Sequence, residues 1–309
     1  MTDFMNYLVL GLTRGSMYAL IALGYTLVYG VLQLINFAHS EVFMSGAFGS
    51  FIVIHAIVGD GKNTSSWAVP LLILLGIVSG GLTAAAVAWS LERVAYRPLR
   101  RRGAPKLAFL ISAIGASFFL SQFAGKLFHR FQNTPFPSFY NEDAVAFHIF
   151  GARVRVIQLV IMGAAVVMMI FLDRLVSKTK LGRSIRAVSE DAPTAALMGI
   201  DIDKTISRTF VIGGALGGAA GFLFGLTLGF GNQMGFIPGV KAFAAAVLGG
   251  IGNIRGAMIG GLLLGVVENM VPLVGIDTKW TDVVAFVVLV LVLMFRPTGI
   301  LGERLGRAA

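Results

Sequence analysis

Nine apolar segments follow one another along this chain, most of them separated by short polar stretches, and they constrain its fold more than any other feature. About 20 apolar residues of helix are enough to cross the hydrocarbon core of a bilayer. Only 13% of the residues are charged, about half of the share that is usual in a soluble domain. We predict an all-α, polytopic membrane bundle of about eight or nine transmembrane segments, forming a single domain over residues 1–309. The segments are 7–31, 42–58, 67–91, 107–128, 155–173, 209–230, 239–251, 256–274 and 281–296.

The segment 239–251 is too short to cross a bilayer as a regular helix, so we predict a re-entrant or broken helix there. Residues 26–30 resemble residues 227–231, and each group ends an apolar segment. In the topology predicted below, the two segments run in opposite directions, as in the inverted repeats of transporters. An inverted repeat is therefore a further hypothesis.

Basic residues gather at 93–106, at 174–208 and from residue 296 onward. By the positive-inside rule these three regions face the cytoplasm, which puts the N-terminus outside and the C-terminus inside the cytoplasmic (inner) membrane. The net charge of +10 then reflects membrane topology, and we expect no nucleic-acid partner. A weaker, opposite signal comes from Lys126, Arg130, Arg153 and Arg155 in a loop that this topology sends outward.

Signatures of catalysis are absent from the sequence. There is no cysteine, no phosphate-binding G-x-x-x-x-G-K-[ST] motif, and neither H-E-x-x-H nor G-x-S-x-G. We therefore expect no catalytic residue, no metal site and no cofactor, and any ATP hydrolysis must occur in a partner.

A polar break at Asn36, His39, Ser40 and Glu41 interrupts two apolar runs with almost no linker. Such a break at membrane depth is tolerated only where protein or a water-filled cavity satisfies the backbone. These four residues are our candidates for a substrate pathway or gate. The alternative is a short cytosolic turn capped by Asn36 or Ser40, and a less favoured one is a membrane enzyme that uses His39 and Glu41.

Three further ionisable residues, Arg14, Asp173 and Glu268, lie within or beside apolar segments. An ionisable group inside the membrane is a functional candidate. The alternative, structural interpretations are that Asp173 neutralises Arg174, that Arg14 snorkels to the membrane surface or forms an ion pair, and that Glu268 lies at an interface. A chain of carboxylates for a proton relay is missing, so we do not expect coupling to a proton gradient.

Glycines recur every four residues at Gly213, Gly217, Gly221 and Gly225. This spacing lets helix backbones approach closely, which predicts helix packing. The alternative is a helix that moves or lines a pore.

The basic loop at about 176–206 carries apolar residues at helical spacing and ends in a glycine suited to a helix C-terminus. It predicts a short amphipathic helix that docks a soluble partner, or one that lies on anionic lipid. The residues of this loop that we single out are Gly182, Arg183, Arg186, Glu190, Asp191, Ala195 and Gly199.

Several stretches, in this order, resemble the permease subunits of the branched-chain amino acid (LIV-type) ABC importers, most closely the H-type permease. The resemblance covers essentially the whole chain. One departure is Ser40, where the usual N-F-A-H-G pattern has glycine, and another is the extra Arg and His of the loop 129–155. The stretches are 15–30, 36–39, 96–100, 182–200, 248–253 and 295–300.

The resemblance implies a transporter subunit that is not itself an enzyme. Its partners would be a second permease in a heterodimer, two cytosolic ABC ATPases, an extracytoplasmic substrate-binding protein and the lipid bilayer. Residues 183–200 would form the coupling helix, and the substrate would be Leu, Ile or Val. Urea or a short-chain amide remains open as the substrate, and a gradient-driven secondary transporter is a further alternative.

Overall fold

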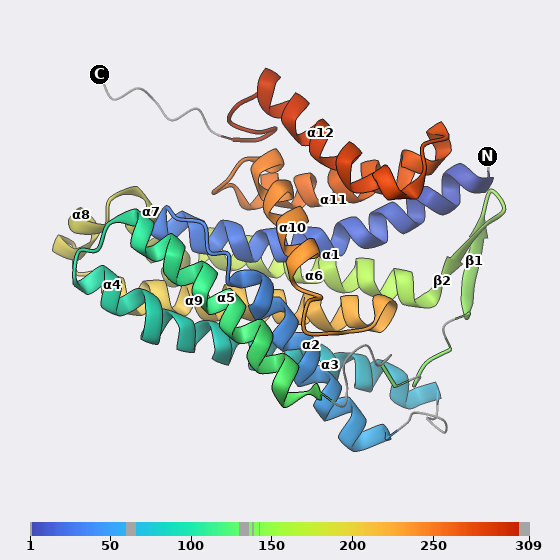
Figure 1. The fold of residues 1–309 in the computed structure, drawn as a ribbon, viewed down its shortest axis with the longest axis horizontal. Coiled ribbons are helices and arrows are strands. Elements are labelled where there is room, and N and C mark those ends of the chain that lie inside the picture. The colour runs from blue at the N-terminus through green and yellow to red at the C-terminus, as the bar shows by residue number, and fades with distance from the viewer. Residues whose placement is uncertain (1, 60–65, 130–135, 138, 142, 303–309) are drawn as a thin grey trace. The chain divides into compact units, whose positions relative to one another are not determined.

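The computed structural model describes residues 2–59, 66–129, 136–137, 139–141 and 143–302 (Figure 1). Arg304 and Arg307, which support the predicted orientation, and Arg130, which opposes it, lie outside the described residues, as does part of the loop 129–155. The longer helices are α1 (Thr2–Leu32), α2 (His39–Val58), α3 (Val69–Leu91), α5 (Lys106–Leu127), α6 (Val156–Lys178), α9 (Ile202–Leu228), α10 (Phe236–Gly249), α11 (Ile254–Met270) and α12 (Thr281–Phe295). The shorter ones are α4 (Arg97–Arg101), α7 (Lys180–Glu190), α8 (Ala192–Leu197), η1 (Ser66–Ala68), η2 (Glu92–Tyr96), η4 (Val271–Val274) and η5 (Thr278–Trp280).

The predicted fold class is confirmed, since helices occupy all nine apolar segments. Among the described residues, eight helical stretches are long and apolar enough to cross a membrane. The ninth, α10, has 14 residues and is about 21 Å long at 1.5 Å per residue, against roughly 30 Å of hydrocarbon. Residues 26–30 are helical, whereas α9 ends at Leu228 and Gly229 adopts a φ of 76°. The two similar pentapeptides therefore differ in local structure, and the inverted repeat stays a prediction.

Backbone contacts divide the chain into two compact units. The first unit comprises residues 1–26, 142–173 and 241–309, and the second comprises residues 27–141 and 174–240. Helices α1, α6 and α10 each contribute one part to each unit.

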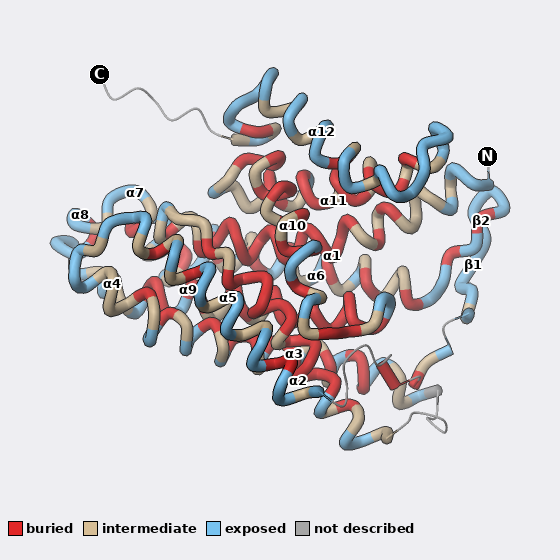
Figure 2. Tube along the Cα trace, in the orientation of Figure 1, coloured by how far each residue is buried: buried red, intermediate tan, exposed pale blue. Residues whose placement is uncertain are grey.

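In the second unit, α2, α3 and α9 form the most extensive helix contacts. The three backbones meet at Gly46, Gly80 and Gly218, where a Cβ added to any one would overlap backbone atoms of another. A Cβ on Gly214 would overlap the backbone carbonyl of Ala84, and one on Gly221 would overlap that of Phe43. Gly213, Gly217 and Gly225 are also buried, and Figure 2 shows α2 and α9 buried over most of their length. Glycine costs about 0.5–1 kcal/mol of helix stability relative to alanine, so this packing has to offset the intrinsic cost of so many glycines.

A non-helical segment, residues 229–235, links α9 to α10 and is held inside the second unit. Its Phe230 lies between aromatic rings, with ring centroids 4.3 Å from Phe51 and 5.1 Å from Phe48. The Ser121 hydroxyl donates to the carbonyl oxygen of Asn232 at 2.7 Å. Because side chains of the same unit pack on this segment and donate to its backbone, a non-helical segment is tolerated among the helices.

In the first unit, α1 packs on α11 and α11 packs on α10 through small residues. A Cβ at Gly11 or Gly15 would meet the backbone of Val266 or Leu262, and one at Gly260 would overlap the carbonyl of Ala245. After α12 the chain returns to the end of α10, because the Ile300 and Leu301 amides donate to the carbonyls of Leu248 and Gly249 at 2.8 and 3.0 Å.

A two-stranded antiparallel hairpin, β1 (Val145–Ile149) and β2 (Ala152–Arg155), precedes α6 and is an addition to the predicted helical fold. Its two-residue turn has positive φ at both positions, 47° at Phe150 and 84° at Gly151, as the twist of hairpin strands favours. The alternating pattern before and after Gly151 is the signal that predicts it.

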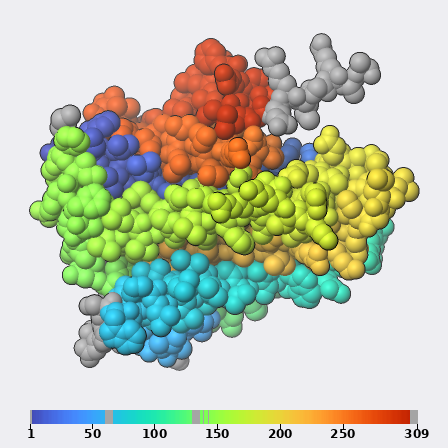
Figure 3. Space-filling view, turned by 180° about the vertical axis from the view of Figure 1, so that it is seen from behind, coloured from blue at the N-terminus to red at the C-terminus, as the bar shows by residue number. Residues whose placement is uncertain are grey.

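Apolar side chains cover the outside of α6 and α12. Val167 and Phe171 of α6 are exposed, and its atoms lie on the surface along the helix in Figure 3. Only 6% of the stretch Thr278–Phe295, which comprises η5 and α12, is buried. Helices that expose apolar residues in this way are suited to contact with lipid.

Candidate functional site

The polar break between α1 and α2 is buried. Asn36, His39, Ser40 and Glu41 are all at most 5% exposed. The Asn36 side-chain oxygen accepts from the amide of Ala38 at 3.1 Å and from the hydroxyl of Tyr96 at 2.6 Å. Asn36 thus forms a local side-chain turn that starts α2, while Ser40 does not cap the helix.

His39 lies beside the middle of α9. Its Nε2 would be 3.3 Å from a Cβ placed on Gly217, which is well inside α9 (Ile202–Leu228). A bilayer-spanning helix has its centre at the depth of the hydrocarbon core. This position favours the gate or pathway interpretation over a turn at the membrane surface.

Glu41 is a buried carboxylate with an incomplete set of donors. Its Oε1 accepts from the hydroxyls of Ser117 at 3.3 Å and Ser40 at 3.4 Å. Its Oε2 has no hydrogen-bond partner among the described residues. That oxygen faces residues 229–235, because a Cβ on Gly235 would lie 3.4 Å from it. A buried carboxylate oxygen without a donor is costly, and a ligand that brings N–H groups would remove that cost.

A second group of charged residues lies in the first unit, around the buried pair Lys241 and Glu268. Lys241 of α10 donates to Oε1 of Glu268 at 2.8 Å and to Asp282 at 2.7 Å. The hydroxyl of Tyr18 reaches the same Glu268 oxygen at 3.4 Å, and Arg14 lies 3.9 Å from it. Lys241 and Glu268 are buried, whereas Arg14 is partly exposed and Asp282 is exposed, and the two cations and two carboxylates cancel formally. We call these five residues the ion cluster.

The sequence located this cluster only in part. Arg14 pairs rather than snorkels, and Glu268 is buried among helices of its own unit. Lys241 was missed, although a lysine inside the apolar segment 239–251 is itself a signal that an acidic partner is near. The expected pairing of Asp173 with Arg174 was wrong, because Asp173 binds Arg255 of α11 at 3.2 Å.

The basic loop forms two short helices, α7 and α8, where one was predicted. Pro193 in the first turn of α8 and Asp191 between the helices cause the break. The side chain and backbone amide of Thr194 donate to the Asp191 carboxylate, which lowers the pKa of Asp191 below its ordinary value. Gly199, with a φ of 85°, then ends α8 in the expected way, since Ile200 donates to Ala195 and Gly199 to Ala196.

The predicted residues of this loop divide into a buried and an exposed set. Gly182 and Ala195 are buried, and Arg186 donates to the carbonyl of Val176 at 2.7 Å. Next to Gly199, Leu197 is 88% exposed and Met198 80% exposed, although both are apolar. Exposed apolar side chains beside charges are typical of a protein-binding surface. The exposed members are Arg183, Arg186, Glu190, Asp191 and Gly199.

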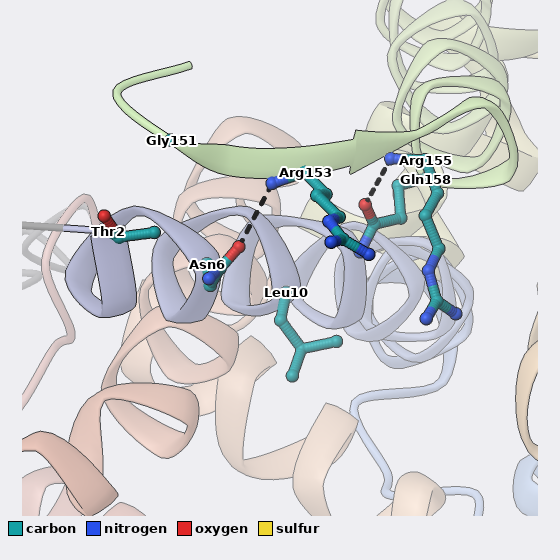
Figure 4. A pocket seen from close by; sticks show the side chains of 7 residues that line it. All are labelled: Thr2, Asn6, Leu10, Gly151, Arg153, Arg155 and Gln158. Atoms are coloured by element: carbon teal, nitrogen blue, oxygen red, sulfur yellow. Dashed lines mark hydrogen bonds between the residues drawn. The ribbon is translucent and has the colours of Figure 1, made fainter. Parts of the chain in front are cut away.

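A cavity of about 550 Å³ opens beside the first turns of α1 (Figure 4). Its lining comes from α1, the hairpin and the start of α6, and the amide of Arg153 donates to Asn6 at 3.3 Å. The guanidinium groups of Arg153 and Arg155 make the cavity suited to an anionic group. The lining residues are Thr2, Asn6, Leu10, Gly151, Arg153, Arg155 and Gln158.

Within the described part of the chain, no group of three or more His, Asp or Glu side chains could hold a metal ion.

Comparison with known proteins identifies the family of this chain. The sequence model of the family described as "Branched-chain amino acid transport system / permease component" matches residues 7–293. The high-affinity branched-chain amino acid transport system permease protein LivH of Escherichia coli (strain K12) is 45% identical over 303 residues, which cover 97% of this chain and 96% of LivH. The corresponding protein BraD of Pseudomonas aeruginosa is 45% identical over 306 residues, with the same coverage of both chains.

The ion cluster gives a stability prediction. Replacing Lys241 by Met leaves Glu268 buried without its closest cation, so we expect a loss of about 3–5 kcal/mol in the free energy of unfolding. The double variant Lys241→Met, Glu268→Met removes both charges and should recover part of that loss. Unfolding of the purified protein in detergent measures both.

Lys204→Met is the matched control, because Lys204 pairs with Asp201 at an exposed site worth about 0–1 kcal/mol. If Lys241→Met is no less stable than Lys204→Met, or if the double variant is as unstable as the single one, the cluster does not stabilise the first unit.

Proposed function

This chain belongs to the family of permease components of branched-chain amino acid transport systems, and on that premise we propose that its substrate crosses the membrane at the polar break between α1 and α2. The chain is a multi-pass permease subunit of a branched-chain amino acid ABC importer and is not itself an enzyme. Such a permease works in a transporter complex with ATPase and substrate-binding components. The finer proposals concern the substrate-contacting residues, the orientation and the partner surfaces.

The buried carboxylate of Glu41 carries the pathway proposal. An amino acid presents an ammonium group, and Glu41 has one oxygen, Oε2, without a donor among the described residues. A charge-assisted hydrogen bond between the two would compensate the desolvation of both groups. Ser40 and Ser117 orient the carboxylate through its other oxygen, while Asn36 and His39 shape the break around it. The apolar surroundings suit the side chains of Leu, Ile and Val, which we propose as substrates.

For the orientation, we propose the N-terminus outside and the C-terminus inside the inner membrane. The basic loops support this through the positive-inside rule. The backbone bonds from Ile300 and Leu301 to the end of α10 support it further, because they put the chain after α12 on the same side as the α10–α11 turn. With α10 re-entrant or broken, α11 then crosses outward and α12 inward.

The partner surfaces follow from this orientation. The loop at 176–206 faces the cytoplasm, where α7 and α8 form the coupling element for an ATPase, with Leu197 and Met198 as apolar anchors. The cavity at Arg153 and Arg155 faces outward, towards the substrate-binding protein. A second, homologous permease completes a heterodimeric pathway, and two ATPases bind to the pair. When the ATPases close, α8 moves and the helices repack to alternate access.

Glu41→Gln tests the pathway. We expect leucine uptake by proteoliposomes with the complete transporter to fall by roughly 10- to 100-fold, because a hydrogen bond to a charged group contributes about 1.5–3 kcal/mol. Subunit composition should be unchanged, since glutamine has nearly the same shape. Asp3→Asn, which neutralises an exposed carboxylate of α1, is the control. Uptake by Glu41→Gln equal to that of Asp3→Asn would remove Glu41 from the pathway.

Leu197→Asp tests the coupling surface. An apolar side chain that becomes buried when the ATPase binds contributes about 2 kcal/mol or more to the interface. The amount of ATPase that co-purifies with the permease should therefore fall at least tenfold. Leu197→Met keeps the apolar character and should behave like the wild type. Undiminished ATPase binding by the aspartate variant would assign the coupling role to another segment.

A further inference from the structure

The end of α3 continues through a π-helical turn, η2 (Glu92–Tyr96), into α4. Single π turns are rare in proteins overall, but those that occur are often found at functional sites. Arg93, Arg97 and Arg101 are spaced by four residues across it. A step of four residues rotates slightly past one full turn in an α-helix and stops slightly short of one in a π-helix. The step from Arg93 to Arg97 crosses the π turn and the step from Arg97 to Arg101 follows α4, so the two small rotations have opposite signs and the three arginines share one face.

Carboxylates behind this face hold two of the arginines in place. Glu92, fully buried, accepts from Arg97 at 3.1 and 3.2 Å and from Arg100 at 3.0 Å. Asp203, in the first turn of α9, binds Arg100 at 2.6 Å and Arg101 at 2.8 Å. These bonds fix guanidinium positions, and neither carboxylate lines the cavity described next.

A cavity of about 450 Å³ lies on the arginine face. The cavity is lined by four arginines and no carboxylate, and two of the four, Arg93 and Arg102, have no ion-pair partner among the described residues, an arrangement that favours an anion. Its lining residues are Arg93, Arg97, Pro98, Arg101 and Arg102.

An exposed apolar stripe leads along α3 to this cavity. Its residues recur at helical spacing, so they lie on one face of the helix. At its end, Trp89 lies under the Arg93 guanidinium, 5.2 Å from the ring centroid. Tryptophan is enriched at the boundary between hydrocarbon and headgroups. The stripe consists of Leu71, Leu74, Val78, Leu82 and Trp89.

We propose that the arginine cavity binds the phosphate of an anionic phospholipid whose acyl chains lie along the α3 stripe. Arginine forks bind phosphate oxygens in pairs. Inorganic phosphate shares the headgroup chemistry but makes no use of the stripe. An acidic surface of a partner protein would match the charge of the cavity but would make no use of the apolar stripe beside it. Charge and apolar surface are both matched only by the lipid.

The experiment uses the complete transporter in nanodiscs that contain phosphatidylglycerol and phosphatidylcholine. After delipidation, native mass spectrometry counts the phosphatidylglycerol retained by the permease. We expect wild-type enrichment to fall roughly 10- to 30-fold in Arg93→Gln, Arg102→Gln, since each basic residue near an anionic surface contributes about 1 kcal/mol. Neither arginine supports the fold through an ion pair, so the subunit ratio should stay unchanged.

The control Lys106→Gln, Lys178→Gln removes two exposed charges outside the cavity and should retain the lipid as the wild type does. Added inorganic phosphate should not displace the phosphatidylglycerol. Three results would overturn the proposal: wild-type retention in the arginine variant, full displacement by inorganic phosphate, or loss of ATPase subunits with lipid retention unchanged. The second would assign the site to a free ion and the third to a protein partner.

Discussion

Direct contact between helix backbones is the interaction on which the second unit depends. Gly46, Gly80 and Gly218 bring α2, α3 and α9 together so closely that no Cβ fits at any of the three positions. In lipid the hydrophobic effect does not drive helices together, so association rests on such packing and on interhelical hydrogen bonds. The start of α2 lies beside α9 in the same unit, and the four polar residues of the break are buried there.

The two buried glutamates, Glu268 and Glu41, differ in their partners and therefore in the role that we assign to each. Glu268 has Lys241 and Arg14 as neighbouring cations, so its charge is neutralised within the first unit. Glu41 has hydroxyl donors but no cation among the described residues, and one of its oxygens accepts no hydrogen bond there. Neutralised charge contributes to the fold, whereas an open carboxylate suits a cationic ligand that binds and leaves.

Much of this structure follows from the sequence because lipid imposes simple rules. Length and apolarity predicted the helices, and the short segment 239–251 corresponds to the 14-residue helix α10, whose re-entrant or broken course stays a prediction. The polar break and the four-residue glycine spacing pointed to the right helices, although neighbours such as Gly214 and Gly218 make the closest contacts together with Gly221. Periodicity alone does not give the rotation of a helix to within one residue.

The ion pairs could not be predicted from the sequence, because their two residues lie far apart in the chain. The Lys241–Glu268 pair joins residues 27 positions apart, and Asp203 reaches arginines about a hundred positions earlier. The π turn at Glu92–Tyr96 has no sequence signature of its own, yet it decides which face Arg97 and Arg101 share with Arg93. The division of the basic loop into α7 and α8 could have been predicted from Asp191 and Pro193, because proline is favoured in the first turn of a helix and disfavoured in its interior.

The central claim is that this chain supplies a path across the membrane and that partner ATPases supply the energy. Leucine uptake into proteoliposomes tests it most directly, comparing the purified chain alone with the complete transporter and its binding protein. The account predicts accumulation only with the complete set and ATP, and none by the chain alone under any ion gradient. Gradient-driven uptake by the chain alone would contradict it.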